Sequence, residues 1–213
     1  MKKGLFIVLE GPDRSGKSTQ AALLKTSLEG FGHEVMVTRE PGGTCLSEKI
    51  RRILLDAKSR IEPMTELFLY ETSRIQHTLE KIIPALKIGK IIISDRYTLS
   101  TTAYQGYGRG LPLKTVEMLN RIATLGLKPD LTVIMDIPDK VFARRERLMQ
   151  GRDRIEREPD LFRKRVNRAY KLLAGRPCMT RINAGRPVEA IQKDIRTRVE
   201  RILRKAGKCK DKK

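Results

Sequence analysis

Apolar residues gather in five short runs along the chain, and longer stretches with helical spacing separate these runs. The segments 91–93 and 131–135 are apolar apart from one threonine. Continuous runs of this kind are typical of parallel strands buried on both faces of a sheet. The intervening stretches are long enough for crossover helices. The pattern therefore predicts an α/β protein with three α/β/α layers around a five-stranded parallel sheet, with strands at 5–10, 34–38, 90–94, 131–136 and 178–183.

A glycine-rich turn follows the first expected strand directly. Residues 11–18 read Gly-Pro-Asp-Arg-Ser-Gly-Lys-Ser, which has the spacing of a phosphate-binding P-loop. Gly11 and Gly16 allow the backbone to curl until successive N–H groups face phosphate oxygens. Lys17 supplies a positive charge for the β- and γ-phosphates, and the Ser18 hydroxyl can ligate Mg²⁺. We therefore expect a P-loop NTPase fold that binds a nucleotide here.

Charged residues also follow the second and third expected strands. Arg39 precedes a Pro-Gly-Gly turn, and Asp95 and Arg96 come directly after the third strand. In a doubly wound sheet, ligands bind at the carboxyl ends of the strands. Asp95 can hold Mg²⁺ or its water, and Arg96 can neutralise phosphate charge in the transition state. A salt bridge at the strand end is the alternative for this pair.

A helical stretch at 65–79 places Tyr70 and Arg74 on one face, because they are four residues apart. The tyrosine ring can stack on a nucleobase while the guanidinium donates to a carbonyl of the base. An amphipathic core helix with an exposed arginine is the alternative.

The segment at about 144–157 is rich in Arg and Glu and contains a glycine within a helical pattern. Such a segment fits a helical lid that closes over polyphosphate and contributes arginines. A pair of solvated, salt-bridged helices is the alternative. No repeat or linker interrupts the chain, so we expect residues 1–213 to form one domain.

The formal net charge is +20, and residues 141–213 hold 24 Lys and Arg against 9 Asp and Glu. A polyanion such as nucleic acid is one interpretation of this excess. We favour solvated basic helix faces and a basic tail at about 205–213, because aromatic residues are not interleaved with the charges. We therefore expect no nucleic-acid partner.

The three cysteines, at positions 45, 178 and 209, are odd in number and far apart. They suggest neither a disulfide framework nor a metal set, so we expect a reducing cytoplasm. No run of about 18 apolar residues exists, so we expect no membrane span. Only four residues precede the first expected strand, so we expect no signal peptide.

Together these segments resemble the thymidylate kinase family of P-loop nucleoside-monophosphate kinases. The resemblance covers nearly the whole chain. Besides the P-loop, it is carried by Glu-Pro-Gly-Gly-Thr at 40–44, Tyr70 with Arg74, Asp-Arg-Tyr at 95–97, Ala-Tyr-Gln-Gly at 103–106 and Asp-Arg-Ile-Glu at 153–156. It implies transfer of a phosphoryl group from ATP to dTMP with Mg²⁺, giving dTDP and ADP for dTTP synthesis. It also suggests a homodimer built on helix packing.

The resemblance also implies roles for individual residues. ATP would be bound by Gly11, Pro12, Asp13, Arg14, Ser15, Gly16, Lys17, Ser18, Thr19 and Arg186. The acceptor dTMP would be bound by Asp13, Arg39, Tyr70, Arg74, Arg96, Thr101, Tyr104 and Gln105, with Tyr104 crowding the 2′ position of the sugar. The metal would lie at Ser18 and Asp95. The catalytic set would be Lys17, Arg14, Arg96, Asp95, Arg152 and Arg154.

The sequence leaves open which arginine meets the γ-phosphate, because Arg14 lies in the P-loop while Arg152 and Arg154 lie in the lid. No strong general base is needed, since the second pKa of a phosphate monoester is about 6. Alternatives are a kinase for another nucleoside monophosphate or for a deoxynucleoside, with uridylate the nearest competitor, and a nucleic-acid-binding NTPase.

Overall fold

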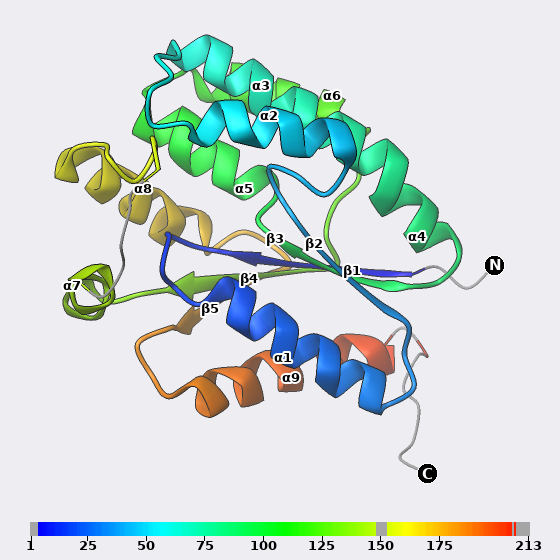
Figure 1. The fold of residues 1–213 in the computed structure, drawn as a ribbon. Helices are drawn as coiled ribbons and strands as arrows, with labels where there is room; N and C mark the ends of the chain where they lie inside the picture. Colours follow the sequence, from blue (N-terminus) through cyan, green and yellow to red (C-terminus); the bar gives the residue numbers. More distant parts are fainter. Residues whose placement is uncertain (1–3, 148–152, 206, 208–213) are drawn as a thin grey trace.

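The computed structural model describes residues 4–147, 153–205 and 207 (Figure 1). Its centre is a sheet of five parallel strands in the order β2-β3-β1-β4-β5. The predicted strands and the α/β class are confirmed, and each strand end differs from its expected position by at most one residue. The strands are β1 (Leu5–Glu10), β2 (Val35–Arg39), β3 (Ile91–Asp95), β4 (Leu131–Asp136) and β5 (Met179–Asn183).

Both faces of the sheet are buried, which is why its central strands have continuous apolar sequences. Leu5, Ile7 and Leu9 of β1 join the core on one face. Phe6 and Val8, which alternate with them, join a separate core on the other face. Successive side chains of a strand point to opposite faces, so β1 anchors both layers of helices.

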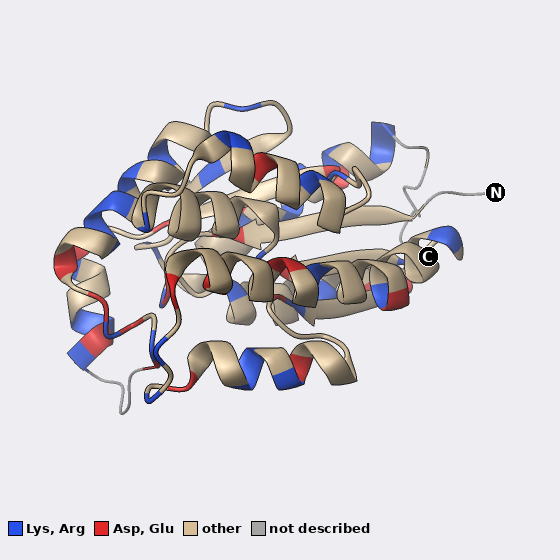
Figure 2. Cartoon of the chain, turned by 90° about the horizontal axis from the view of Figure 1, so that it is seen from above, with Lys and Arg blue, Asp and Glu red and all other residues tan. Residues whose placement is uncertain are grey.

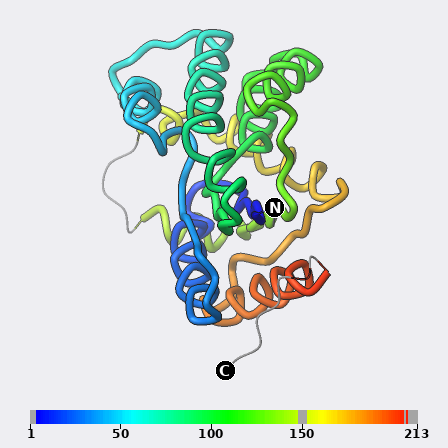
Figure 3. Tube along the Cα trace, turned by 90° about the vertical axis from the view of Figure 1, so that its right-hand side faces the viewer, coloured from blue at the N-terminus to red at the C-terminus, as the bar shows by residue number. Residues whose placement is uncertain are grey.

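Helices α1 (Lys17–Gly30) and α9 (Val188–Lys205) lie side by side against one face of the sheet (Figures 1 and 3). On the other side lie α2 (Cys45–Leu55), α3 (Pro63–His77), α4 (Ile83–Lys87), α5 (Thr98–Thr101), α6 (Leu113–Ala123) and α8 (Asp160–Leu173), with two wider helical segments, η1 (Thr78–Ile82) and η2 (Thr102–Gly108). This is the three-layer arrangement that the hydrophobic pattern predicts.

The expected lid lies only partly within the described residues. Helix α7 (Asp139–Arg147) follows β4, residues 148–152 are outside the description, and turns at 154–157 lead into α8. The expected basic tail is described only at Lys205 and Gly207. Lys and Arg are spread over many helices and are interspersed with Asp and Glu (Figure 2). Among the described helices, none is long and apolar enough to cross a membrane.

Candidate active site

The P-loop connects β1 to α1 and needs glycine at two positions. Gly11 has a φ of +132°, and a Cβ there would lie 2.6 Å from the carbonyl oxygen of Met135. Gly16 has a φ of +91° and immediately precedes the first residue of α1. The first turn of α1 carries no acidic residue, so the positive end of its dipole is not neutralised from within the helix. The local fold therefore offers backbone N–H groups to an anion.

Lys17 is buried behind this loop. Its Nζ donates to the carbonyl oxygens of Gly11 at 3.1 Å and Pro12 at 2.8 Å. Burial, together with the positive charge of Arg96, lowers the pKa of Lys17 to about 8 although Asp95 and Asp13 oppose the shift. A buried ammonium that is bonded to neutral carbonyls is better stabilised when an anion arrives, which suits a phosphate site.

Two side chains at the loop fit a magnesium ion that also binds phosphate. The Ser18 hydroxyl donates to Oδ2 of Asp95 at 2.6 Å. Among the described residues, no group of three His, Cys, Asp or Glu side chains could hold a metal ion unaided. Mg²⁺ typically takes one or two protein oxygens and completes its shell with waters and substrate phosphates. Ser18 and Asp95 meet that requirement only when a nucleotide supplies further oxygens.

Arg96 links the P-loop to the end of β3. Its Nη2 pairs with Asp13 and also donates to the Tyr104 hydroxyl at 3.2 Å, while Nη1 donates to the Gly11 carbonyl at 3.0 Å. The Tyr104 hydroxyl in turn donates to Asp13 at 2.9 Å. Burial would raise the pKa of Asp13, but Arg96 and Lys17 outweigh it and lower that pKa to about 2. Asp13 is therefore a fixed anion that holds both Arg96 and Tyr104.

A buried carboxylate, that of Glu10, holds two side chains that contact Arg96. Glu10, at the end of β1, accepts from the Ser100 hydroxyl at 2.6 Å and from the Tyr170 hydroxyl at 3.2 Å. Ser100 and Tyr170 also lie within hydrogen-bonding distance of Arg96 Nη1. Burial raises the pKa of Glu10 despite these contacts and the charge of Arg96. The guanidinium is thus held in one orientation by groups from four segments of the chain.

A cavity of about 600 Å³, partly open to solvent, adjoins Asp13 and Arg96. Seven residues that the sequence suggests for dTMP line it together: Asp13, Tyr70, Arg74, Arg96, Thr101, Tyr104 and Gln105. The sequence did not suggest the other lining residues as dTMP ligands, namely Glu40, Pro41, Arg51, Leu55, Tyr97, Ser100, Asp153 and Ile155. Arg51 lies on α2, twelve residues beyond Arg39, and no local motif marks it.

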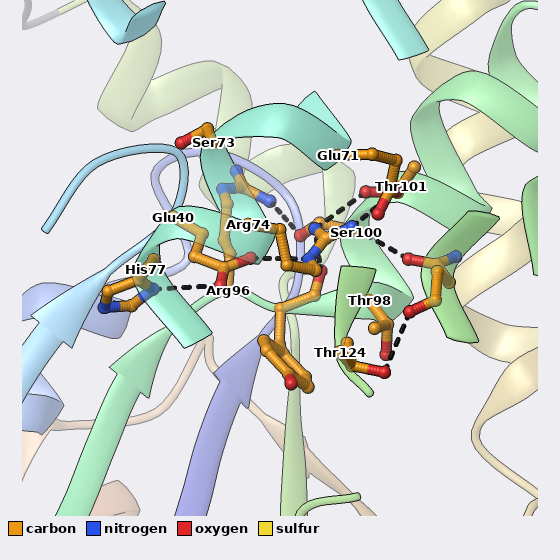
Figure 4. Close-up of polar contacts among 12 residues, drawn as sticks. Glu40, Glu71, Ser73, Arg74, His77, Arg96, Thr98, Ser100, Thr101 and Thr124 are labelled. Atoms are coloured by element: carbon orange, nitrogen blue, oxygen red, sulfur yellow. Dashed lines mark hydrogen bonds and ion pairs between the residues drawn. The ribbon is translucent and has the colours of Figure 1, made fainter. Parts of the chain in front are cut away.

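Arg74 forms the floor of this cavity and is fully buried (Figure 4). Its Nε donates to Glu40 at 2.8 Å, its Nη1 pairs with Glu71, and its Nη2 donates to Thr101 at 2.8 Å. The remaining acceptors are Asn120 and the carbonyl oxygen of Tyr97. The five N–H groups of the guanidinium thus have five acceptors. Glu40 also bonds to the buried His77, and the charge of Arg74 keeps the pKa of Glu40 low although burial opposes this.

Other residues suggested by the sequence lie elsewhere. Arg39 does not line the cavity, and its side chain is 56% exposed and pairs with Glu48 at 3.1 Å. Arg186 pairs with Asp194 of α9. Arg154 pairs with Glu66, as described below. Arg152 lies outside the described residues.

The side chain of Arg14 links the P-loop to the segments on either side of residues 148–152. It pairs with Glu146 of α7 at 3.0 Å and with Glu156 at 3.4 Å. A second cavity separates these segments, and Asp13, Tyr104 and Ile155 line both this cavity and the first one. The two cavities therefore adjoin beside the P-loop.

Comparison with known proteins shows to which family the chain belongs. A family model described as thymidylate kinase matches residues 9–195. The chain belongs to the thymidylate kinase family. It is 43% identical to a thymidylate kinase of Pelotomaculum thermopropionicum over 94% of this chain and 95% of that one. It is 45% identical to one of Gloeobacter violaceus over 93% and 96%.

A solved structure agrees as well. The crystal structure of thymidylate kinase from Ehrlichia chaffeensis superposes with a TM-score of 0.75, at 31% identity, over 92% of this chain and 98% of that one. Thymidylate kinases transfer a phosphoryl group from ATP to dTMP, and the expected fold and activity are thereby confirmed.

Proposed function

We propose that dTMP binds in the cavity floored by Arg74, and that its phosphate meets the γ-phosphate of ATP at the wall formed by Asp13, Tyr104 and Ile155. The observation that carries this proposal is that these three residues line both cavities. Transfer is in line: the bond from an oxygen of dTMP to the γ-phosphorus forms as the bond to the β–γ bridging oxygen breaks. The acceptor phosphate is already anionic at neutral pH, so no strong base is required.

The acceptor phosphate is held by Arg96 and Arg51. Both line the cavity, and burial and the charges of Arg39 and Arg96 lower the pKa of Arg51, which indicates an excess of positive charge that an anion relieves. Tyr70 stacks on the thymine ring, while Arg74 and Thr101 face its polar edge. The Nη2 N–H of Arg74 that donates to the Thr101 hydroxyl would donate to a carbonyl oxygen of the base as well.

Lys17, Arg14 and the P-loop N–H groups hold the phosphates of ATP, and Ser18 and Asp95 hold Mg²⁺, which neutralises phosphate charge when bound. The buried position of Lys17 and the 2.6 Å contact between Ser18 and Asp95 support these roles. Catalysis then rests on alignment and charge neutralisation within one domain formed by residues 1–213.

The test is a coupled assay of ADP release with ATP and Mg²⁺, comparing dTMP, dUMP, UMP, dCMP and thymidine. A strong preference for dTMP is expected. Preference for UMP or dCMP would refute the acceptor pocket, and ADP release that needs DNA instead of an acceptor would favour a nucleic-acid-dependent NTPase. Arg51→Ala should raise the KM for dTMP about tenfold, the usual worth of a charged hydrogen bond, whereas its neighbour Arg39→Ala should change it far less.

A homodimer is proposed from an apolar surface on three neighbouring helices. Exposed apolar side chains recur at helical spacing on α3 and α6: Phe68 is 53% exposed, and Met118 and Ile122 are each 55% exposed. Ile53 of α2 adds to them at 50% exposed. Helix α3 contacts both α2 and α6, and exposed apolar side chains gathered on neighbouring helices favour an interaction surface. Analytical ultracentrifugation should give a dimer that Phe68→Glu converts to a monomer, with Lys164→Glu on α8 as the control; a monomeric wild type would refute the dimer.

The cysteines fit a reducing compartment. Cys45 and Cys178 are free and exposed, which is the ordinary condition of thiols in a cytoplasm. Fractionation of the native host should recover the protein with cytoplasmic enzymes, and recovery from an oxidising compartment would contradict this placement.

A further inference from the structure

The lid arginine that the sequence offers as a partner of the γ-phosphate is bound to the opposite, acceptor side of the site. Nη1 of Arg154 pairs with Glu66 of α3 at 2.6 Å. Its Nε donates to the carbonyl oxygen of Leu54 at 2.8 Å, and its backbone N–H donates to that of Leu55 at 3.2 Å. These are the last two carbonyls of α2, which lack partners within the helix. A cation at the C-terminus of a helix is also favoured by the helix dipole.

Glu66 is the centre of this network and is fully buried. Its Oε1 accepts from Gln105 at 2.7 Å, and both oxygens accept from Arg109, at 3.1 and 2.9 Å. Arg109 reaches on to Glu158, in the same segment as Arg154, at 2.6 Å. Burial raises the pKa of Glu66, but Arg109, Gln105 and Arg154 outweigh it and keep that pKa low. A buried carboxylate thus ties residues 153–158 to α3 and η2 through two arginines.

The residues on either side of Arg154 line the acceptor cavity. Asp153 and Ile155 belong to its wall, and Ile155 also lines the second cavity beside the P-loop. Fixing Arg154 therefore fixes two neighbouring residues in the wall of the acceptor cavity.

We infer that Arg154 is a positioning residue that seats Asp153 and Ile155 in the wall of the acceptor cavity by binding Glu66 and the C-terminus of α2, and that it does not neutralise the γ-phosphate. This inference rests on the assignment of that cavity to dTMP. Its energetic basis is that moving the Arg154 side chain to the phosphates would leave the Leu54 carbonyl oxygen and part of a buried carboxylate without partners. Arg109 would still compensate the charge of Glu66, so a substitution at Arg154 should leave the protein folded.

The alternative has one structural argument in its favour. Nη2 of Arg154 is buried and has no partner among the described residues, so it has an N–H group to offer to a phosphate. If Nη2 contacted the γ-phosphate, replacing Arg154 would lower kcat. A positioning role would instead raise the KM for dTMP.

The experiment is steady-state kinetics of Arg154→Ala with dTMP and ATP varied in turn. The expected result is a KM for dTMP raised about tenfold, the worth of one charge-assisted hydrogen bond, with kcat and the KM for ATP changed less than about threefold. Arg154→Lys keeps a cation for Glu66 and should restore part of the affinity for dTMP. Arg165→Ala, which removes an exposed arginine of α8, is the matched control.

A loss of kcat on the order of 10³-fold with both KM values unchanged is the signature of an arginine finger and would overturn the inference. Unchanged kinetics would overturn it as well. Arg14→Ala, measured in parallel, is expected to show the loss of kcat. A double-mutant cycle of Arg154→Ala and Glu66→Gln adds a direct test. If the two residues act together, the effects of the two substitutions on the KM for dTMP should be less than additive. The wild-type acceptor preference tests the assignment of the cavity independently.

Discussion

Replacing Arg74 by methionine tests whether the floor of the acceptor cavity is a structural ion-pair network. Methionine replaces the aliphatic part of arginine but has no charge and no hydrogen-bond donor. The change leaves Glu40 and Glu71, both at most 6% exposed, without the cation that now pairs with them. It also removes donors from three further oxygen atoms.

The expected cost is set by the buried carboxylates. Breaking a buried ion pair by removing one partner costs about 3–5 kcal/mol, because the remaining charge is uncompensated. Native proteins have a total stability of about 5–15 kcal/mol, so this loss is a large share of it. For a chain of this size, the midpoint of thermal unfolding should fall by about 10 °C.

Urea unfolding followed by circular dichroism measures the loss, and Arg176→Met is the matched control. Arg176 pairs with Glu117 at 3.2 Å, but both side chains are about half exposed. An exposed pair contributes about 0–1 kcal/mol, so the control should be nearly neutral. Equal losses in the two variants would refute the reasoning.

The loss from Arg74→Met should also depend on pH. In the wild type, the lowered pKa of Glu40 contributes stability that is present above the unfolded pKa and is lost as the pH falls through the folded value. Without Arg74, burial dominates and raises the pKa of both carboxyl groups, as it already does for Glu71. The variant can then relieve its buried charge by protonation, so the difference from wild type should be smaller at pH 5 than at pH 8.

When ATP binds at pH 8.5, the protein should take up most of a proton, because contact with phosphate raises the pKa of Lys17 from about 8. Calorimetry in two buffers of different ionisation enthalpy measures the proton uptake. Uptake that persists in Lys17→Met would contradict the role of Lys17. Tyr104→Phe should lower kcat/KM for dTMP about tenfold, because Asp13 loses a donor and Arg96 an acceptor; unchanged kinetics would show that the hydroxyl is dispensable. Asp95→Asn should raise the Mg²⁺ concentration for half-maximal activity about tenfold or more, and an unchanged magnesium titration would remove Asp95 from the metal site.

The fold could be predicted because its signals are local. The P-loop is a contiguous motif, and strands buried on both faces have an apolar sequence wherever they lie in the sheet. The cavity was predictable where a short spacing places side chains on one face, as with Tyr70 and Arg74. Arg51 was missed because only the packing of α2 against α3 turns it toward the cavity. Arg39 lies at the carboxyl end of β2, where ligands of such sheets usually bind, but its side chain pairs with Glu48.

Partners far apart in the sequence decide which arginine can bind phosphate. A guanidinium must exchange its carboxylate partners for phosphate, and the exchange is costly when those carboxylates stay behind in a buried site. Arg154 would leave Glu66, whose side chain is 0% exposed, whereas Arg14 would leave Glu146 and Glu156, which are 28% and 21% exposed and can be resolvated. Exchanging a carboxylate partner for phosphate therefore costs more free energy at Arg154 than at Arg14. On this difference rests our proposal that Arg14 binds the phosphates and that Arg154 supports the wall of the acceptor cavity.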